Sequence, residues 1–162
     1  MERIVNTNSK KINITKLYSQ NNGLKPVGLW YAINNEWVDW CLSQEPDWIK
    51  SNNILVEIDE GKVLTLKNTE QIKEFIARYK KLITPPIEYK NWLLPIEYIN
   101  WFLLAQEYAG IEIQNYHEIK FESFQNINLL PMTWFFAWDV SGGCIWDLSI
   151  IKKQLIKIQK NE

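Results

Sequence analysis

The stretch from Ala105 to Tyr116 reads Ala-Gln-Glu-Tyr-Ala-Gly-Ile-Glu-Ile-Gln-Asn-Tyr, and its residue pattern predicts a change from helix to strand. The helical pattern ends at Gly110, a residue type that commonly follows the last helical turn. Ile111, Glu112 and Ile113 then alternate apolar, acidic and apolar, as in a strand with one buried face. We therefore expect Glu112 to point away from the core. At the border of a cleft such a fixed carboxylate suits chemistry, and the plainer interpretation is a solvated strand glutamate.

Length and charge limit the classes of protein to which the chain can belong. Its 162 residues are enough for one domain with its own core. The net charge of -1 provides no overall field that would attract nucleic acid or an anionic membrane. The most hydrophobic run, Trp92 to Ala105, is interrupted by Pro95 and Glu97 and is too short to cross a bilayer. We expect a cytoplasmic protein with a single domain over residues 1–162, in which residues 1–10 form a flexible arm or a short edge segment.

The cysteines and histidine favour a protein without a metal site. Cys41 and Cys144 lie among apolar residues, which predicts buried thiols, with a single disulfide as the alternative. His117 is the only histidine, so a structural zinc site lacks ligands. The nine tryptophans exceed what a core of this size requires, and such aromatic residues can serve as core, interface or ligand platform.

Strand and helix patterns interleave without the regular cadence of a doubly wound sheet, so the predicted class is α+β. Asn34 or Asn35, Thr69, Pro95 and Asp147 are the expected helix starts, and residues 115–131 read as packed loop or short strand. Strands are expected at residues 11–19, 29–32, 53–59, 62–66, 111–113, 134–139 and 144–146, with a hairpin joining 53–59 to 62–66. The chain lacks the glycine-rich nucleotide-binding motifs and the Gly-x-Ser-x-Gly motif, which disfavours Rossmann dehydrogenases, P-loop NTPases and α/β-hydrolases.

Three stretches, in chain order, resemble the ADP-ribosyltransferase superfamily in its divergent bacterial, phage and viral branches. Gly28-Leu29-Trp30-Tyr31-Ala32 resembles its glycine, apolar, aromatic, aromatic, small strand. The segment Ile54 to Leu66, with the following helix, resembles its pair of strands and helix. The run from Asn100 to Ile113 resembles the segment that delivers the family's catalytic glutamate.

The resemblance implies a split β-sandwich of two small sheets with flanking helices, an NAD cleft, and transfer of ADP-ribose from NAD with release of nicotinamide. Glu112 is the implied catalytic carboxylate, and no metal is implied. The acceptor stays open among protein, nucleic acid and small molecule, and a toxin-like enzyme of this kind can have an antitoxin or regulator. The implied NAD-binding residues are Ser19, Lys25, Gly28, Leu29, Trp30 and Tyr31, with Tyr31 or Trp30 stacking on nicotinamide.

The chain departs from the family at its expected first strand, where the family places a histidine or arginine that grips the NAD ribose. Residues 11–19 contain neither, and Lys16, Tyr18, Ser19 or Lys25 could donate a hydrogen bond instead. The alternative interpretation is a non-catalytic module that uses exposed tryptophans to bind a protein or another ligand. A weaker alternative is a nucleic-acid role for the lysines at 10–11 and 152–153.

Overall fold

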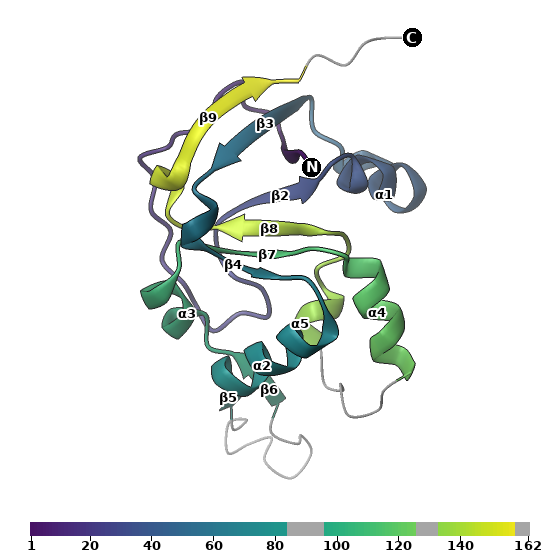
Figure 1. Cartoon of the computed structure of the whole chain (residues 1–162). Helices are drawn as coiled ribbons and strands as arrows, with labels where there is room; N and C mark the ends of the chain where they lie inside the picture. Colours follow the sequence, from purple (N-terminus) through teal and green to yellow (C-terminus); the bar gives the residue numbers. More distant parts are fainter. Residues whose placement is uncertain (84–95, 126–132, 158–162) are drawn as a thin grey trace, which may run out of the picture.

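The structure is a computed structural model that describes residues 1–83, 96–125 and 133–157 (Figure 1). Three short 3₁₀ helices, at Pro46–Trp48, Glu60–Lys62 and Leu148–Ile150, join longer elements. Those elements are β1 (Arg3–Thr7), β2 (Leu29–Ile33), α1 (Glu36–Gln44), β3 (Asn52–Ile58), β4 (Val63–Leu66), α2 (Thr69–Tyr79), β5 (Lys80–Ile83), β6 (Ile96–Ile99), α3 (Trp101–Glu107), β7 (Gly110–Ile113), α4 (Tyr116–Gln125), α5 (Thr133–Phe136), β8 (Gly142–Ile145) and β9 (Ile151–Ile156).

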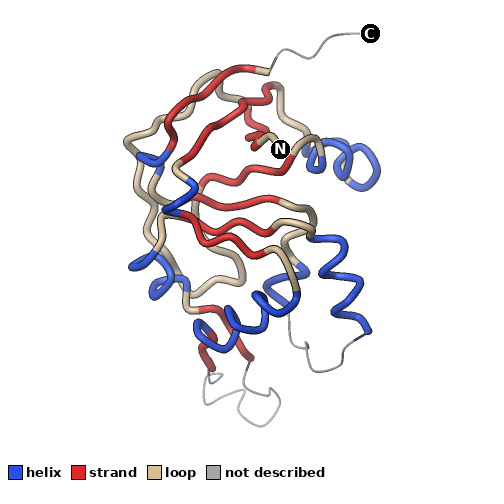
Figure 2. Tube along the Cα trace, in the orientation of Figure 1, coloured by secondary structure: helices blue, strands red, loops and turns tan. Residues whose placement is uncertain are grey.

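Seven strands form one strongly curled sheet in the order β4-β7-β8-β2-β1-β3-β9 (Figure 2). Its neighbouring strands run antiparallel except β4 and β7, which are parallel. The strands β5 and β6 form a separate antiparallel pair. The predicted α+β class is confirmed. In place of the two small sheets expected from the sequence, the described residues form one sheet of seven strands and one of two.

Two apolar cores lie on opposite faces of the curled sheet. Helices α2 to α5 cover one face, where Ile111 and Ile113 pack with the buried Trp134. The inner face of the curl holds the second core, which includes Val5 and Tyr31. Because successive side chains of a strand point to opposite faces, neighbouring residues of β2 belong to different cores. Trp30 packs against the first core and Tyr31 belongs to the second.

The N-terminal residues form a central strand instead of the expected arm or short edge segment. Strand β1 lies between β2 and β3 and pairs with both of them. Its buried Ile4 and Val5 hold it against the sheet, and its polar Asn6 donates a hydrogen bond to the side chain of Asn53 (2.8 Å). The expected first strand at residues 11–19 is wrong, because in that range only Leu17 forms a bridge, to Asp147.

The strands at 53–59 and 62–66 were predicted correctly as β3 and β4, but the hairpin between them is wrong. Strand β3 pairs with β1 and β9, and β4 pairs with β7. The turn at Glu60–Lys62 is a 3₁₀ helix that redirects the chain to the far edge of the sheet. Local sequence specifies a strand but not its partner, because pairing depends on packing with distant strands.

The helix beginning near Thr69 is confirmed as α2, although its cap is Asn68, whose side chain accepts from the backbone N–H of Gln71. Helix α1 begins at Glu36 after Asn35, as predicted. The predicted helix start at Pro95 lies outside the described residues, and the helix there, α3, begins only at Trp101. Residues 116–125, expected to be irregular, form α4.

Two predictions near the C-terminus are wrong. The aromatic run at 134–139 contains the short helix α5, because Trp134 and Phe135 are buried against the first core. The expected final helix is the strand β9. Asp147 does act as a cap, but of the 3₁₀ helix at Leu148–Ile150. The apolar residues of β9 have a helical spacing, but pairing with the long strand β3 decides its conformation.

No helix in the described part of the chain is long and apolar enough to cross a membrane.

Candidate functional site

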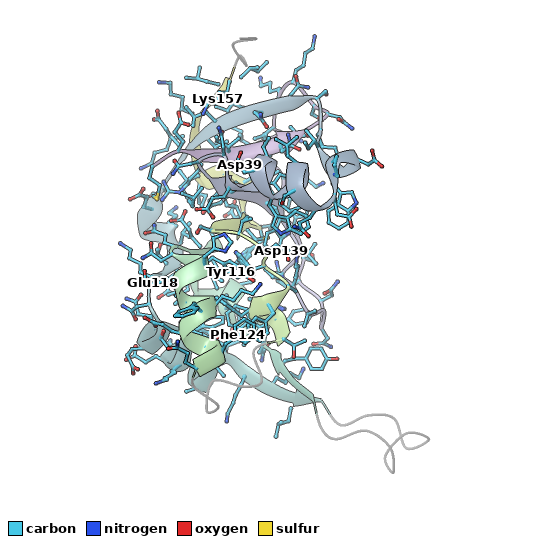
Figure 3. The ribbon with its side chains drawn as sticks, turned by 90° about the vertical axis from the view of Figure 1, so that its right-hand side faces the viewer. Asp39, Tyr116, Glu118, Phe124, Asp139 and Lys157 are labelled. Atoms are coloured by element: carbon cyan, nitrogen blue, oxygen red, sulfur yellow. The ribbon has the colours of Figure 1, made fainter. Side chains whose placement is uncertain are left out.

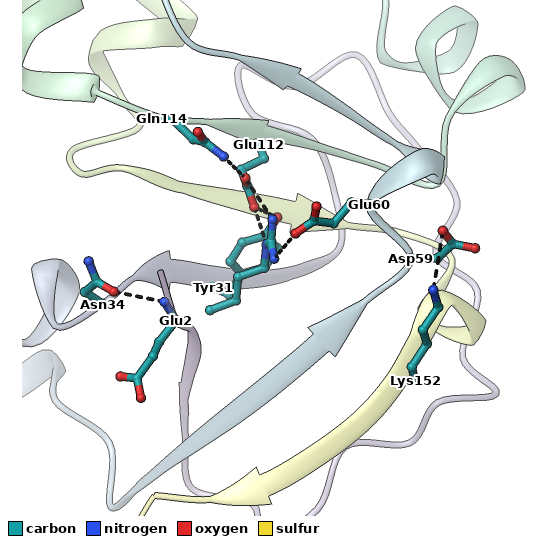
Figure 4. Close-up of polar contacts among 9 residues, drawn as sticks. Glu2, Tyr31, Asn34, Asp59, Glu60, Glu112, Gln114 and Lys152 are labelled. Atoms are coloured by element: carbon teal, nitrogen blue, oxygen red, sulfur yellow. Dashed lines mark hydrogen bonds and ion pairs between the residues drawn. The ribbon is translucent and has the colours of Figure 1, made fainter.

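A row of three residues from adjacent strands brings the two main candidate residues together. In the register of the sheet, Tyr31 of β2 lies opposite Gly143 of β8, and Gly143 lies opposite Glu112 of β7. A Cβ atom at Gly143 would lie 2.5 Å from the ring carbon Cζ of Tyr31, so only glycine leaves space for this ring. The tyrosine crosses over β8, and its hydroxyl donates to Oε2 of Glu112 at 2.6 Å (Figure 4).

The carboxylate of Glu112 receives hydrogen bonds from three side chains. Arg3 donates through Nε to Oε2 (2.5 Å) and through Nη2 to Oε1 (3.2 Å). Gln114 donates to Oε1 at 2.6 Å, and Tyr31 donates the fourth bond. A carboxylate has about four acceptor positions, so these donors occupy all of them. Glu112 is completely buried, and the prediction that it points away from the core is wrong because the curled sheet encloses its inner face.

Arg3 joins this buried group to the surface. It comes from β1 and is itself 8% exposed. Its Nη1 atom lies 2.8 Å from Oε1 of Glu60, whose side chain is 67% exposed. One arginine therefore bridges a buried carboxylate and a solvated one. We call Arg3, Tyr31, Glu60, Glu112 and Gln114 the Glu112 cluster (Figure 4).

The cluster keeps Glu112 ionised and Tyr31 protonated. Burial alone would raise the pKa of Glu112, but the hydrogen bonds from Arg3, Tyr31 and Gln114 outweigh it and lower that pKa below its ordinary value of 4.5. Burial and the nearby charge of Glu112 raise the pKa of Tyr31. Burial alone would lower the pKa of Arg3. The interactions with Glu112 and Glu60 outweigh this effect and raise that pKa above its ordinary value, so the arginine stays charged. The cluster therefore holds a completely buried carboxylate in its charged form.

The lowered pKa of Glu112 predicts a loss of stability in acid. A group with a depressed pKa in the folded state contributes stability that is full above its ordinary value, here 4.5, and disappears as the pH falls through the folded pKa. We expect the free energy of unfolding, measured by urea denaturation, to fall between pH 7 and pH 3 more steeply in the wild type than in Glu112→Gln. Equal pH slopes for the two proteins would contradict this assignment.

A hollow borders the cluster at Gln114. Its volume is about 380 Å³, and its lining includes Met1, Ile33, Gln114 and His117. We call it the N-terminal hollow. Gln114 is partly exposed and also bonds to Glu112, so it lies between the hollow and the buried carboxylate. The size falls within the range of about 300–1,000 Å³ that is usual for small-molecule sites.

A second pocket lies on the opposite face of β2 and is lined by four tryptophans. Its volume is about 280 Å³. We call it the tryptophan pocket, and its lining residues include Trp30, Trp37, Trp48, Trp138, Lys25 and Lys50. Trp30 and Trp138 meet edge to face with ring centroids 4.6 Å apart. Asp139, next to this wall, lies between α1 and α5 in the side view of Figure 3.

The structure separates the predicted NAD-binding residues into different places. Lys25, Trp30 and Tyr31 line the tryptophan pocket, and the phenol of Tyr31 reaches Glu112 on the other face. Leu29 packs against the inner core, while Ser19 lies on an exposed loop. Gly28, predicted to admit a backbone or a ligand, admits a backbone, because an added Cβ would clash with the carbonyl of Ile145.

Sequence reasoning missed four residues of the site. Arg3 was assigned to a terminal arm or a short edge segment, and Glu60, Gln114 and Gly143 were not singled out. The Ile111-Glu112-Ile113-Gln114 alternation places Gln114 on the same strand face as Glu112, so the pattern held that signal. No local pattern links Arg3 to a residue 109 positions away.

The described residues contain no group of three metal-ligating side chains. Both cysteines are buried free thiols, and burial raises the pKa of Cys144. His117 is exposed, with Nε2 3.9 Å from a carboxylate oxygen of Glu36. None of these groups has the contacts of a nucleophile or a ligand in the described part of the chain.

No family model, no curated protein and no solved structure matches the chain.

Proposed function

We propose that the protein transfers ADP-ribose from NAD to an acceptor, with Glu112 as the essential carboxylate and nicotinamide as the leaving group. The observation that carries this proposal is the convergence of Arg3, Tyr31 and Glu112, from three strands, in one cluster. The family resemblance assigns the ribose grip to a cationic residue of the first strand. The first strand is β1, and its Arg3 supplies the cation that residues 11–19 lack. An ADP-ribosyltransferase-like fold is part of the same proposal.

The chemistry requires a negative charge held close to the reacting sugar. The bond between C1′ of the ribose and the nicotinamide nitrogen breaks, and its electron pair leaves with nicotinamide. The oxocarbenium-like sugar is stabilised by the Glu112 carboxylate. The acceptor nucleophile then forms a bond to C1′ and loses its proton. Because the cluster lowers the pKa of Glu112, the carboxylate is available in the charged form at neutral pH.

Entry of NAD requires one donor to leave Glu112, and the geometry favours Gln114. Arg3 and Tyr31 are buried, whereas Gln114 borders the N-terminal hollow. A ribose hydroxyl can replace the amide of Gln114 as donor to Oε1, so the number of hydrogen bonds to the carboxylate is conserved. Catalytic hydrogen bonds of ligand-free proteins often change when substrate binds. The nicotinamide ribose would therefore enter from the N-terminal hollow.

The direct test is release of nicotinamide from millimolar NAD by the purified protein, with and without candidate acceptors. Tyr31→Phe removes only the hydroxyl that orients Glu112, and we expect a loss of about tenfold or more. Glu112→Gln should lower the rate by about 10²–10³, the cost typical of removing a group that stabilises transition-state charge. Glu70→Gln, an exposed carboxylate on α2 that lines neither pocket, is the matched control and should keep full activity.

Two results would overturn the proposal. Equal turnover by Glu112→Gln and wild type would remove this carboxylate from the reaction. Absence of nicotinamide release, together with no rise in melting temperature at millimolar NAD, would leave no role for the dinucleotide.

The second candidate function is a non-catalytic binding module. The tryptophan pocket favours it, because four tryptophans bordering one pocket are a typical anchor site for a ligand. Ligand binding at this pocket without nicotinamide release would support the module and not the enzyme.

A further inference from the structure

The tryptophan pocket and the Glu112 cluster lie on opposite faces of β2, and Tyr31 is the one residue that belongs to both. Trp30 and Tyr31 are consecutive residues of β2, so their side chains point to opposite faces of the sheet. The ring of Tyr31 reaches Glu112, while the ring of Trp30 meets Trp138. A ligand in the tryptophan pocket therefore occupies a second site.

Two aromatic walls border this site. One wall consists of Trp30 and Trp138. The other belongs to the segment that follows β2, where the ring centroids of Trp37 and Trp48 lie 6.2 Å apart and the ring planes are inclined by 26°. Trp48 is 49% exposed although it is a large apolar side chain. Exposed flat rings beside a pocket form a platform on which another planar ring can stack.

The charges around the pocket select against a cation. Aromatic cages can bind quaternary ammonium groups, but the ammonium of Lys25 already lies over the ring of Trp30, 5.1 Å from its centroid. Lys50 also lines the pocket, and none of the described lining residues carries a carboxylate. Lys25 forms a long ion pair with Asp139, whose Oδ2 lies 3.9 Å from Nζ, beyond hydrogen-bond distance. A second cation would be repelled, and an anionic group would be attracted.

Spacing along the chain joins the ring platform to a positive charge. Trp48 and Lys50 are two residues apart, so their Cα atoms are at most about 7 Å from each other. One ligand can therefore place a ring against Trp48 and an anionic group near Lys50. The pocket volume of about 280 Å³ lies just below the usual range for ligand sites, which suits one ring system and not a whole dinucleotide.

We propose that the tryptophan pocket binds a nucleotide, with its base stacked on the tryptophans and its phosphate at Lys25 and Lys50. Base, sugar and phosphate combine a flat ring with a nearby negative charge, as the pocket requires. The nucleotide is either free or the end of a nucleic-acid strand, and the two sources share this chemistry. The site does not depend on whether NAD is cleaved at Glu112.

The test is calorimetric titration of the full chain with the four nucleoside 5′-monophosphates, the matching nucleosides and a six-nucleotide single strand. At least one monophosphate should bind, about tenfold tighter than its nucleoside, and the difference should shrink with added salt. Tighter binding of the hexanucleotide than of any monophosphate identifies a strand as the source, and the reverse order identifies the free nucleotide.

Variants locate the ligand on the pocket. Trp48→Ala should weaken binding about tenfold, the usual cost of losing one stacked base. Trp40→Ala is the matched control, because the ring of Trp40 packs against Trp37 and Trp48 without lining the pocket. Failure of all four monophosphates to bind at millimolar concentration, or equal weakening by Trp40→Ala and Trp48→Ala, would overturn the proposal.

Discussion

Glu112→Gln is expected to lower the free energy of unfolding by about 3–5 kcal/mol, the usual cost of removing one partner from a buried ion pair. Arg3 is nearly buried and would keep its charge, but face a neutral amide. Glutamine also has one acceptor oxygen where glutamate has two, so at least one of the donors around it loses its partner. For a chain of this length, such a loss lowers the melting temperature by about 6–20 °C, which differential scanning calorimetry measures.

Glu60→Gln is the matched control for this substitution. Both carboxylates bind the same arginine, but the side chain of Glu60 is 67% exposed and that of Glu112 is fully buried. Solvent screens the exposed pair, so its loss should cost less than about 1 kcal/mol. Similar losses for the two variants would contradict the view that burial, and not contact alone, makes the Glu112 pair important.

A double-mutant cycle with Arg3→Met isolates the pair itself. When the charge of Arg3 is already absent, neutralising Glu112 leaves no unpaired buried cation. The second substitution should therefore cost less than the first, with an interaction energy of about 0.5–3 kcal/mol. Additive losses would mean that Arg3 and Glu112 stabilise the fold independently.

This expected instability affects how activity is measured. Assays of Glu112→Gln must run well below its lowered melting temperature, because unfolded protein also fails to release nicotinamide. Tyr31→Phe keeps the ring and both charges of the pair, so it tests orientation of the carboxylate with less effect on stability.

Local patterns predicted several elements well because they report how one segment buries one face. The strands at 53–59, 62–66 and 111–113 and the helix from 69 carry strong period-2 or period-3.6 signals, and the structure contains them. Strand β9 and helix α5 were missed because pairing with β3 and packing on the first core decide their conformation. Such contacts override local propensity.

The complete burial of Glu112 was missed for a related reason. Alternation correctly gave Ile111 and Ile113 a common face, opposite to that of Glu112. Alternation does not reveal that the sheet curls and encloses its second face as well. Arg3 is the partner that makes burial of this carboxylate tolerable. It belongs to β1, whose short apolar pattern is followed by a polar segment and was not recognised as a central strand. A buried charge of this kind is found only when distant strands are assembled.

Gly143→Ala is expected to disrupt the site at its narrowest point and to cost at least about 1–3 kcal/mol of stability, as is typical of overpacking. The added methyl group would lie 2.5 Å from Cζ of Tyr31 and 2.6 Å from the backbone carbonyl oxygen of Ile111. The tyrosine ring can shift, but the carbonyl belongs to the sheet and cannot move cheaply. A shifted ring withdraws its hydroxyl from Glu112, so nicotinamide release should fall together with stability.

Gly61→Ala provides the comparison for this change. Gly61 lies in the exposed 3₁₀ turn, where the nearest contact of an added Cβ is a side-chain oxygen at 3.6 Å. That substitution should be neutral, or stabilising by up to about 1 kcal/mol through the unfolded state. The free energies of unfolding of both variants, measured by urea denaturation, separate two effects. One is the replacement of any glycine by alanine, and the other is the steric clash of the new methyl group with the ring of Tyr31. If Gly143→Ala is as stable as Gly61→Ala, the phenol of Tyr31 does not cross β8 there, and the contact that joins it to Glu112 has to be abandoned.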